Sequence, residues 1–316
     1  MFIALFLKVF ANALPGAIAQ GLIWGIMAIG VYISYKILDI ADLTVDGSIC
    51  TGACVFALVV GTGNPVWLGI LLAFLAGAAA GTLTGLLHTA LGIPSILAGI
   101  LTQLILYTVN LCILGGKSLM FIDPRANDLL MHVSDNGGSI LSAGIFVAVL
   151  IVGLWLFFYT EVGLTLKSTG DNPDMSRAQG VNVNFNKVLG LAISNGIVAL
   201  AGALYGQYNG FADLNMGRGA IVIGLAAIFI GLSISMKIKP NFVVSLIGVV
   251  GGGVLYYIIY NFVILVMTTF GLKTDYLKMF SAIIVILFLA VPYLYNTYFK
   301  KQKRAPIPQT GGDEHA

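Results

Sequence analysis

The feature that most constrains the fold is a series of apolar runs. Each continues for about 20 residues, the length that an α-helix needs to cross a bilayer. Of the 316 residues, 59% are hydrophobic and only 9% are charged, whereas soluble domains contain about 25% charged residues. Strands of a membrane barrel alternate apolar and polar residues over about 10 residues, and these runs do not alternate. The sequence therefore predicts an all-α polytopic membrane protein.

We expect about nine transmembrane helices, with bounds of eight and ten. The segment Met1–Phe10 is predicted to form a separate surface helix, and if it were a further crossing, the count would be ten. Residues 1–298 are expected to form one transmembrane domain, and the polar tail 299–316 is expected to be disordered. The expected spans are Ala17–Ile37, Asp46–Val60, Val66–Leu91, Pro94–Leu114, Ser139–Tyr159, Lys187–Tyr208, Ala220–Ser235, Phe242–Thr268 and Tyr276–Tyr298.

Basic residues in short loops predict the orientation, because they favour the cytoplasmic side. Four of them follow the last span and predict a cytoplasmic C-terminus: Lys300, Lys301, Lys303 and Arg304. Counting backwards places the charged segment 160–187 in the cytoplasm and the loop Gly115–Gly138 outside. The N-terminus is then also expected outside.

Small residues recur at four-residue spacing within three of the expected spans. This spacing lets helix backbones approach closely in lipid, where apolar burial alone does not drive helices together. The pattern predicts a tightly packed bundle, and it is formed by Gly21 and Gly25, by Gly77, Gly81 and Gly85, and by Gly202, Gly206 and Gly210.

The segment Thr160–Lys187 (TEVGLTLKSTGDNPDMSRAQGVNVNFNK) is the most conspicuous interruption of the apolar pattern. Asn172–Pro173 sets the start of a short helix, since proline suits the first helical turn and the residue before it prefers extended geometry. We expect Asp171 to cap this helix, Asp174–Gln179 to form it and Gly180 to end it. Such a helix between two spans is suited to dock on a soluble partner. The alternative is a solvated connector, which would not require this length or these turn residues.

A second constellation is the acidic stretch Ile37–Gly47 (ILDIADLTVDG), in which Asp39, Asp42 and Asp46 lie close together. An ionisable residue at membrane depth usually faces a cavity or a partner. A solvated inner loop is the alternative. Asp46 is expected to act as the N-cap of the second span, with Thr44 beside it.

The chain resembles permeases of ATP-binding-cassette importers of the branched-chain amino acid and ribose type. Their cytoplasmic coupling loop has the pattern T-x-x-G-x-x-L-x-x-x-G-x-N-P-x-x-A-x-x-x-G-I, which is matched in register by Thr160, Gly163, Leu166, Gly170, Asn172, Pro173 and Gly180. Mild departures occur at Lys167, Asp171, Ser176 and Val181.

Two further motifs extend this resemblance over roughly residues 34–230. The stretch Ile37–Gly47 is similar to the place where a leader helix of the family breaks and a span starts within the bundle. The stretch Leu91–Thr102 (LGIPSILAGILT) is similar to a turn between spans, with Pro94 opening a helix. More narrowly, the chain resembles the subgroup paired with binding lipoproteins for tryptophan or other aromatic amino acids.

The resemblance implies a homodimeric permease in the bacterial inner (plasma) membrane that transports a small polar solute, such as an aromatic amino acid. A separate ATPase subunit is expected on the coupling segment. An extracytoplasmic substrate-binding protein is expected on the outer loops, chiefly Gly115–Gly138 and Asn209–Arg218. The residues assigned to ATPase coupling are Gly163, Lys167, Gly170, Asp171, Asn172, Pro173, Arg177 and Gly180.

Polar residues within the apolar runs are the candidates for the translocation pathway. For each amide among them, a hydrogen bond between helices, worth about 0.6 kcal/mol on average, is the alternative role. Tyr256, Tyr257 and Tyr260 are expected in an interfacial aromatic belt. The pathway candidates are Asp42, Thr44, Asp46, Gln103, Asn110, Asn195 and Asn261.

Two other functional classes are the alternatives to an importer permease. An ion-coupled secondary transporter could use Asp42 or Asp46 as its ion site. A membrane enzyme is disfavoured, because no paired catalytic groups lie at one depth. The sequence also lacks the phosphate-binding pattern G-x-x-x-x-G-K-[ST], so the chain is not expected to bind ATP in that way. No metal or other cofactor is expected, since the three histidines do not cluster with acidic residues: His88, His132 and His315.

Overall fold

The structure is a computed structural model. It describes residues 2–123, 129–131, 133, 135–235, 241–269 and, beyond these, 279, 280, 282, 283, 285, 286 and 290. The helices and strands, in chain order, are α1 Phe2–Tyr32, the π-helix η1 Ile33–Ile37, α2 Val45–Gly61, α3 Val66–Thr89, α4 Ser95–Ile113, β1 Leu119–Phe121, α5 Asn136–Phe158, α6 Glu161–Asp171, α7 Pro173–Ala178, α8 Val183–Asn209, β2 Phe211–Asp213, α9 Ala220–Ser235 and α10 Phe242–Thr269.

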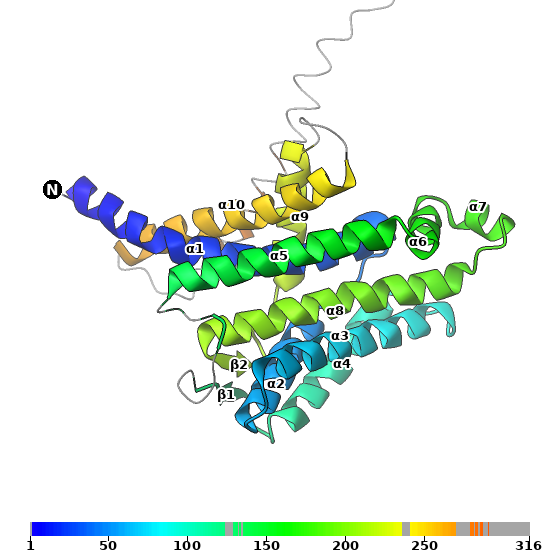
Figure 1. Cartoon of the computed structure of the whole chain (residues 1–316), viewed down its shortest axis with the longest axis horizontal. Helices are drawn as coiled ribbons and strands as arrows, with labels where there is room; N and C mark the ends of the chain where they lie inside the picture. Colours follow the sequence, from blue (N-terminus) through cyan, green and yellow to red (C-terminus); the bar gives the residue numbers. More distant parts are fainter. Residues whose placement is uncertain are drawn as a thin grey trace, which may run out of the picture.

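The long helices lie side by side in a bundle, with α6 and α7 at one end and the two short strands near the other (Figure 1). Within the described residues, 6 helices are long and apolar enough to cross a membrane. They are α1 extended by η1, α3, α4, α5, α8 and α10. The shorter apolar helices are α2 and α9. These features confirm the prediction of an all-α polytopic membrane protein.

The expected spans from Ala17–Ile37 to Phe242–Thr268 each fall on a described helix. The span Tyr276–Tyr298 lies largely outside the described residues, and so do the tail 299–316 and its basic cluster. The total of nine spans therefore stays a prediction. The separate surface helix Met1–Phe10 is wrong, because α1 runs without interruption from Phe2. A single lysine among apolar residues does not stop a helix, and Lys8 lies within α1.

The first helix breaks where the acidic stretch begins, as predicted. Its last turns widen into η1, in which the Leu38 N–H donates to the Ile33 carbonyl at 3.0 Å. The chain then leaves helical geometry, and Asp39 takes a left-handed conformation with φ 55°. The next helix, α2, begins only at Val45, inside the bundle. Residues 38–44 are called the helix break below.

Glycines bring α2 and α3 against the central helix α8. A Cβ atom built on Gly52 of α2 would overlap the Ala199 backbone, and one on Gly202 of α8 would overlap the Ile49 carbonyl. A Cβ on Gly81 of α3 would likewise overlap the Leu191 carbonyl. Only glycine permits these backbone contacts, so the close packing predicted from the glycine spacing is confirmed at these positions. Gly210, in contrast, ends α8 in a left-handed conformation with φ 76°.

A two-stranded antiparallel sheet joins the segments that follow α4 and α8. Leu119 of β1 pairs with Asp213 of β2, and Phe121 pairs with Phe211. The next residue, Ile122, donates its N–H to the Gly210 carbonyl at 2.8 Å. The sequence did not predict these strands. Their pairing places the two loops predicted on the outer side next to each other, at the end of the bundle away from α7 (Figure 1).

The close contacts of α8 predict that alanine is destabilising at Gly202 but not at the control position Gly153. Gly202→Ala should lower the free energy of unfolding by about 1–3 kcal/mol, because a methyl group is forced into a packed backbone contact. Gly153→Ala on α5 is the control, since a Cβ there meets no atom within 4 Å and alanine favours helix by about 1 kcal/mol. Thermal denaturation of the detergent-solubilised protein measures both. A melting temperature of Gly202→Ala at or above that of Gly153→Ala would contradict the packing.

Candidate functional site

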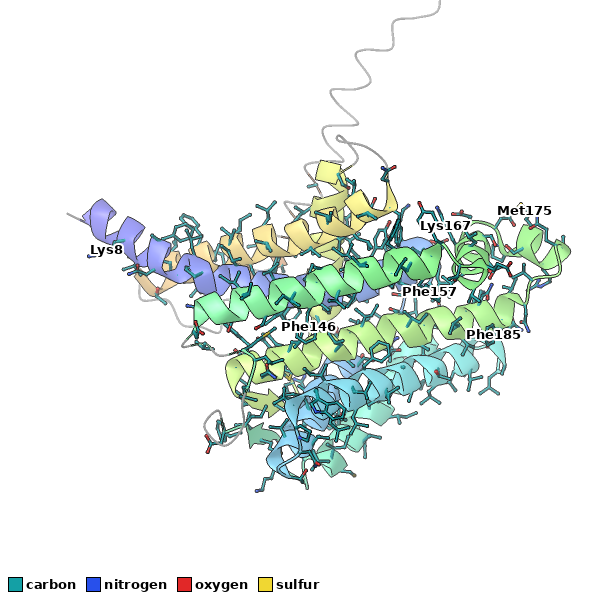
Figure 2. The ribbon with its side chains drawn as sticks, viewed as in Figure 1. Lys8, Phe146, Phe157, Lys167, Met175 and Phe185 are labelled. Carbon is teal, nitrogen blue, oxygen red and sulfur yellow. The ribbon has the colours of Figure 1, made fainter. Side chains whose placement is uncertain are left out.

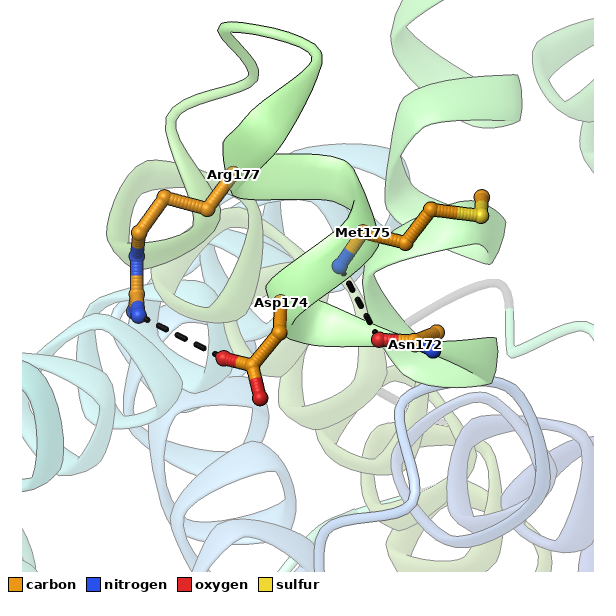
Figure 3. Close-up of polar contacts among 4 residues, drawn as sticks. All are labelled: Asn172, Asp174, Met175 and Arg177. Carbon is orange, nitrogen blue, oxygen red and sulfur yellow. Dashed lines mark hydrogen bonds and ion pairs between the residues drawn. The ribbon is translucent and has the colours of Figure 1, made fainter.

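The charged segment forms two short helices that extend from one end of the bundle (Figures 1 and 2). Thr160 precedes α6 and accepts a hydrogen bond through Oγ1 from the Gly163 N–H at 3.3 Å. Asn172 precedes α7 and accepts one through Oδ1 from the Met175 N–H at 3.0 Å (Figure 3). Each bond satisfies a backbone donor that has no partner within its own helix.

The cap of α7 was predicted one residue too early. Asp171 is the last residue of α6, whereas Asn172 has an extended backbone with φ −157° and so can turn its side chain over the first amides of α7. The helix itself spans Pro173–Ala178, with the proline in its first turn as expected. Gly180 adopts φ 83° just beyond the helix, which confirms its predicted role as the stop.

The small and apolar positions of the coupling pattern hold the two helices against the bundle. Leu166 is fully buried, and a Cβ on Gly163 would overlap the Phe157 carbonyl. A Cβ on Gly170 would overlap the carbonyl oxygen of Ile37, the last residue of η1. Ser176 is also fully buried, and a small residue is needed there because α7 packs on α6. The pattern therefore describes how α6 and α7 are fixed to the end of the first transmembrane helix.

Five exposed positions of α6 and α7 form what we call the docking surface. Its apolar member, Met175, is 48% exposed, and Met175 and Lys167 both lie at the α6–α7 end of the bundle (Figure 2). Arg177 and Asp174 approach to 3.6 Å on this surface (Figure 3). An exposed pair of this kind contributes little to stability, so both groups stay available to a partner. The members of the docking surface are Lys167, Asp171, Asp174, Met175 and Arg177.

The second constellation is a buried polar network that starts at the helix break. The carboxylate of Asp42, which is only 3% exposed, accepts hydrogen bonds from the Thr44 N–H at 2.9 Å and from Asn195 Nδ2 at 2.6 Å. The amide oxygen of Asn195 accepts in turn from Ser48 Oγ at 2.6 Å. A buried charge is tolerated only where it is paired or hydrogen-bonded. Asp42 is therefore part of the packed bundle, in contrast to the exposed Asp39.

Hydroxyl groups extend this network to two more helices. The Thr44 hydroxyl lies 2.7 Å from that of Thr84 on α3, and Thr84 donates to Thr102 Oγ1 on α4 at 2.9 Å. A Cβ on Gly99 of α4 would come within 2.7 Å of the Leu43 nitrogen, so α4 packs directly on the helix break. The break is thus fixed by α3, α4 and α8 together.

Asp46 caps a different helix from the predicted one. It lies inside the first turn of α2, and its two carboxylate oxygens accept from the Gly219 N–H at 3.0 Å and the Ile221 N–H at 2.9 Å. These amides belong to the start of α9. The chain reaches this point because the segment after β2 turns back along α2, where the Gly217 N–H lies 3.1 Å from Cys50 Sγ. Two helices therefore begin beside one carboxylate within the bundle.

A cavity of about 170 Å³ lies between α2, α4 and the segment that leads to α9. Asp46 and Arg218 bring charge to its wall, and α4 brings Gln103, Tyr107 and Asn110. Asn110 is 1% exposed, and its Oδ1 has no hydrogen-bond partner among the described residues. We call this space the α2–α4 cavity.

The predicted pathway residues thus divide into three groups. Three of them line the α2–α4 cavity (Asp46, Gln103 and Asn110), and three belong to the buried network (Asp42, Thr44 and Asn195). Asn261 lies apart from both, and its Nδ2 donates to the Tyr257 carbonyl of its own helix at 3.4 Å. Arg218 was missed as a cavity residue because hydropathy assigned it to an outer loop. The signal for it is an arginine between two glycines immediately before an apolar helix.

The aromatic belt predicted from the tyrosines of α10 is wrong for two of them. Tyr256 and Tyr257 are 1% and 4% exposed, so neither lies at the surface of the bundle. Tyr257 packs on Trp24 of α1 with ring centroids 5.7 Å apart, and Trp24 packs on Tyr205 of α8 at 5.4 Å. These rings join α1, α8 and α10 in the core.

Comparison with known proteins identifies the class of protein to which this fold belongs. Residues 14–291 match the family described as branched-chain amino acid transport system / permease component. The chain therefore belongs to this permease family, which confirms the resemblance found in the coupling segment, the helix break and the turn at Pro94. Membership also favours the permease over the ion-coupled transporter that the acidic stretch had left open.

Three relatives illustrate the similarity. The tyrosine transport system permease protein of Clostridioides difficile (strain R20291) is 38% identical over 299 residues, 94% of this chain and 97% of that protein. An uncharacterized protein of Rickettsia prowazekii (strain Madrid E) is 35% identical over 231 residues, 73% and 81% of the two chains. The autoinducer 2 import system permease protein of Enterobacter sp. (strain 638) is 29% identical over 190 residues, 60% and 55% of the two chains. No solved structure matches the chain significantly.

Asp46 caps α9, whereas Asp39 is exposed, so replacing each aspartate by asparagine should affect stability differently. Asp46→Asn should lower the free energy of unfolding by about 0.5–2 kcal/mol, because an amide has one acceptor oxygen for the two N–H groups that start α9. Asp39→Asn should have almost no effect, since Asp39 is exposed and asparagine tolerates its left-handed backbone. Thermal unfolding in detergent compares the two variants, and equal melting temperatures would argue against the cap.

Proposed function

We propose that this chain is the membrane-spanning permease subunit of an ATP-binding-cassette importer for an aromatic amino acid. The observation that carries the proposal is the docking surface, rigidly attached to the helix break, in a chain that belongs to an amino acid permease family. The relative from Clostridioides difficile, named for tyrosine transport, supports the cargo class over 94% of the chain. ATP hydrolysis takes place in a separate ATPase subunit.

The ATPase docks on α7, and the end of the bundle that carries α6 and α7 faces the cytoplasm together with the C-terminus. Exposed apolar and charged side chains on α6 and α7 support this role, since Met175 can enter an apolar groove while Lys167 and Arg177 meet carboxylates; Met175 and Arg177 project from different sides of α7 (Figure 3). Closure of the ATPase pair then displaces α6 and α7 as one body. Because Gly170 lies directly on Ile37, that displacement reaches the helix break.

Two copies of the chain form the pathway in the bacterial plasma membrane. The exposed apolar side chains of α4, among them Leu101, Leu104 and Ile105, can be covered by lipid or by the second copy. A substrate-binding protein delivers the cargo at the opposite end, where the β1–β2 sheet joins the two outer loops and presents Phe121 at 75% exposure.

The ion-coupled alternative is less well supported by the local chemistry. Both oxygens of Asp46 hold backbone amides, and Asp42 holds the Asn195 amide and the Thr44 N–H. Carboxylates engaged in this way stabilise the broken helices, which is a structural role that an importer permease needs as well.

Reconstitution tests the proposed function directly. Proteoliposomes contain the chain, its ATPase and its binding protein, and uptake of radiolabelled L-tyrosine is measured with L-leucine as a competitor control. We expect uptake that requires internal ATP and the ATPase and that is insensitive to an uncoupler. Uptake that persists without the ATPase and collapses with the uncoupler would establish the ion-coupled transporter instead.

The docking surface predicts variants that separate ATP hydrolysis from transport. Arg177→Glu reverses an exposed charge, and Gly180→Val places a β-branched residue at φ 83°, a strained conformation that redirects the chain after α7. Each variant should lower uptake about tenfold, the effect of about 1.4 kcal/mol of docking energy, while ATP hydrolysis continues and the protein still inserts into the membrane. Lys8→Glu, a charge reversal at the far end of α1 (Figure 2), is the control. Normal uptake by both docking variants would refute the docking role.

A further inference from the structure

Arg218 occupies an unusual position for a charged residue in this chain. The residue after it, Gly219, is hydrogen-bonded to Asp46 at the start of α2. Asp46 lies 15 residues before Gly61, the end of α2, which corresponds to about 22 Å at 1.5 Å per residue. The hydrocarbon core of a bilayer is about 30 Å thick. The exposed Arg218 therefore lies well inside the length of α2, and an arginine at membrane depth is expensive and usually faces a pathway or a partner.

The α2–α4 cavity carries separated opposite charges. Arg218 and Asp46 both line it, yet they form no ion pair with each other, and Arg218 has no ion-pair partner among the described residues. Asp46 is already held by the backbone amides that start α9, which prevents it from moving over to the guanidinium. An open space between a fixed carboxylate and an unpaired guanidinium is complementary to a zwitterion.

The α4 wall of the cavity supplies neutral polar groups. Gln103, Tyr107 and Asn110 are spaced so that they lie along one face of α4. The Oδ1 atom of Asn110 is buried without a donor among the described residues. Leaving a buried acceptor unpaired is unfavourable, and a ligand ammonium group entering the cavity would remove that penalty.

We propose that the α2–α4 cavity is a binding site for the α-carboxylate and ammonium groups of the transported amino acid. Arg218 pairs with the α-carboxylate, because a guanidinium presents parallel donors that match a carboxylate. The ammonium group donates to Asn110 Oδ1 and to a free lone pair of Asp46, since each carboxylate oxygen has a second lone pair. This inference rests on the proposed function and adds to it that the permease itself selects for free amino acids, whatever their side chain.

The test uses the permease–ATPase complex in lipid nanodiscs without the binding protein, so that selectivity of the binding protein does not enter. Binding of radiolabelled L-tyrosine is competed with unlabelled L-tyrosine, with tyramine, which lacks the carboxylate, and with 3-(4-hydroxyphenyl)propionate, which lacks the ammonium group. The wild-type complex should prefer L-tyrosine to either analogue by at least tenfold.

Variants then assign each preference to a residue. Arg218→Gln should weaken L-tyrosine binding at least tenfold and abolish the preference over tyramine. Asn110→Leu should instead reduce the preference over the propionate. Arg218→Lys, which keeps the charge but not the paired donors, should retain part of the preference, and it carries the test if Arg218→Gln fails to assemble. Lys8→Gln removes a distant positive charge and should match the wild type.

Uptake with the binding protein completes the test. Arg218→Gln should take up L-tyrosine at least tenfold more slowly, while the loaded binding protein still stimulates ATP hydrolysis. Wild-type binding and uptake by Arg218→Gln would overturn the binding site proposed in the α2–α4 cavity and leave the proposed function intact. A wild-type complex that imports no aromatic amino acid with ATP would instead overturn the proposed function itself.

Discussion

The hydrogen bond between Asn195 Nδ2 and the Asp42 carboxylate, 2.6 Å long, fixes the place where the first transmembrane helix breaks. Charge-assisted bonds of this kind are the stronger ones, and a carboxylate without partners is costly at this depth. The bond anchors the break to α8, the helix against which α2 and α3 pack through their glycines. Because the break is held there, α2 starts inside the bundle and brings Asp46 to the depth at which α9 begins.

The same helix break connects the docking surface to the α2–α4 cavity. On one side, Gly170 of α6 lies on the Ile37 carbonyl, and a Cβ on Gly190 of α8 would overlap Leu38. On the other side, Asp46 lies at the wall of the α2–α4 cavity. Residues 38–45 connect Ile37, which contacts α6, to Asp46 at the cavity. A displacement of α6 therefore has a short physical route to the groups that we infer to contact the substrate.

Much of this architecture could be predicted because its causes are local in the sequence. Continuous apolar runs predict helices, and the break at Ile37–Gly47 and the turn at Pro94 are confirmed where the motifs placed them. Gly180 was predictable as a stop because a left-handed residue after a helix favours glycine. The cap of α7 was misplaced because Asp171 and Asn172 are neighbours and both residue types cap helices.

Other features depend on contacts between distant parts of the chain, which no local pattern encodes. Asp46 has the chemistry of a cap, but the helix that it caps begins with amides 173 and 175 residues further along. The strands β1 and β2 are only 3 residues long and form because their segments meet. Arg218 was assigned to an outer loop, since hydropathy does not reveal that the segment after β2 turns back along α2.

The most direct measurement is the number of L-tyrosine molecules transported per ATP hydrolysed by a Gly170→Ala complex in proteoliposomes. The added methyl group overlaps the Ile37 carbonyl and so disturbs the contact between α6 and the end of the first helix. If the helix break transmits the movement of the docking surface, ATP hydrolysis continues while the ratio falls well below that of the wild type. A wild-type ratio in this variant would show that coupling takes another route.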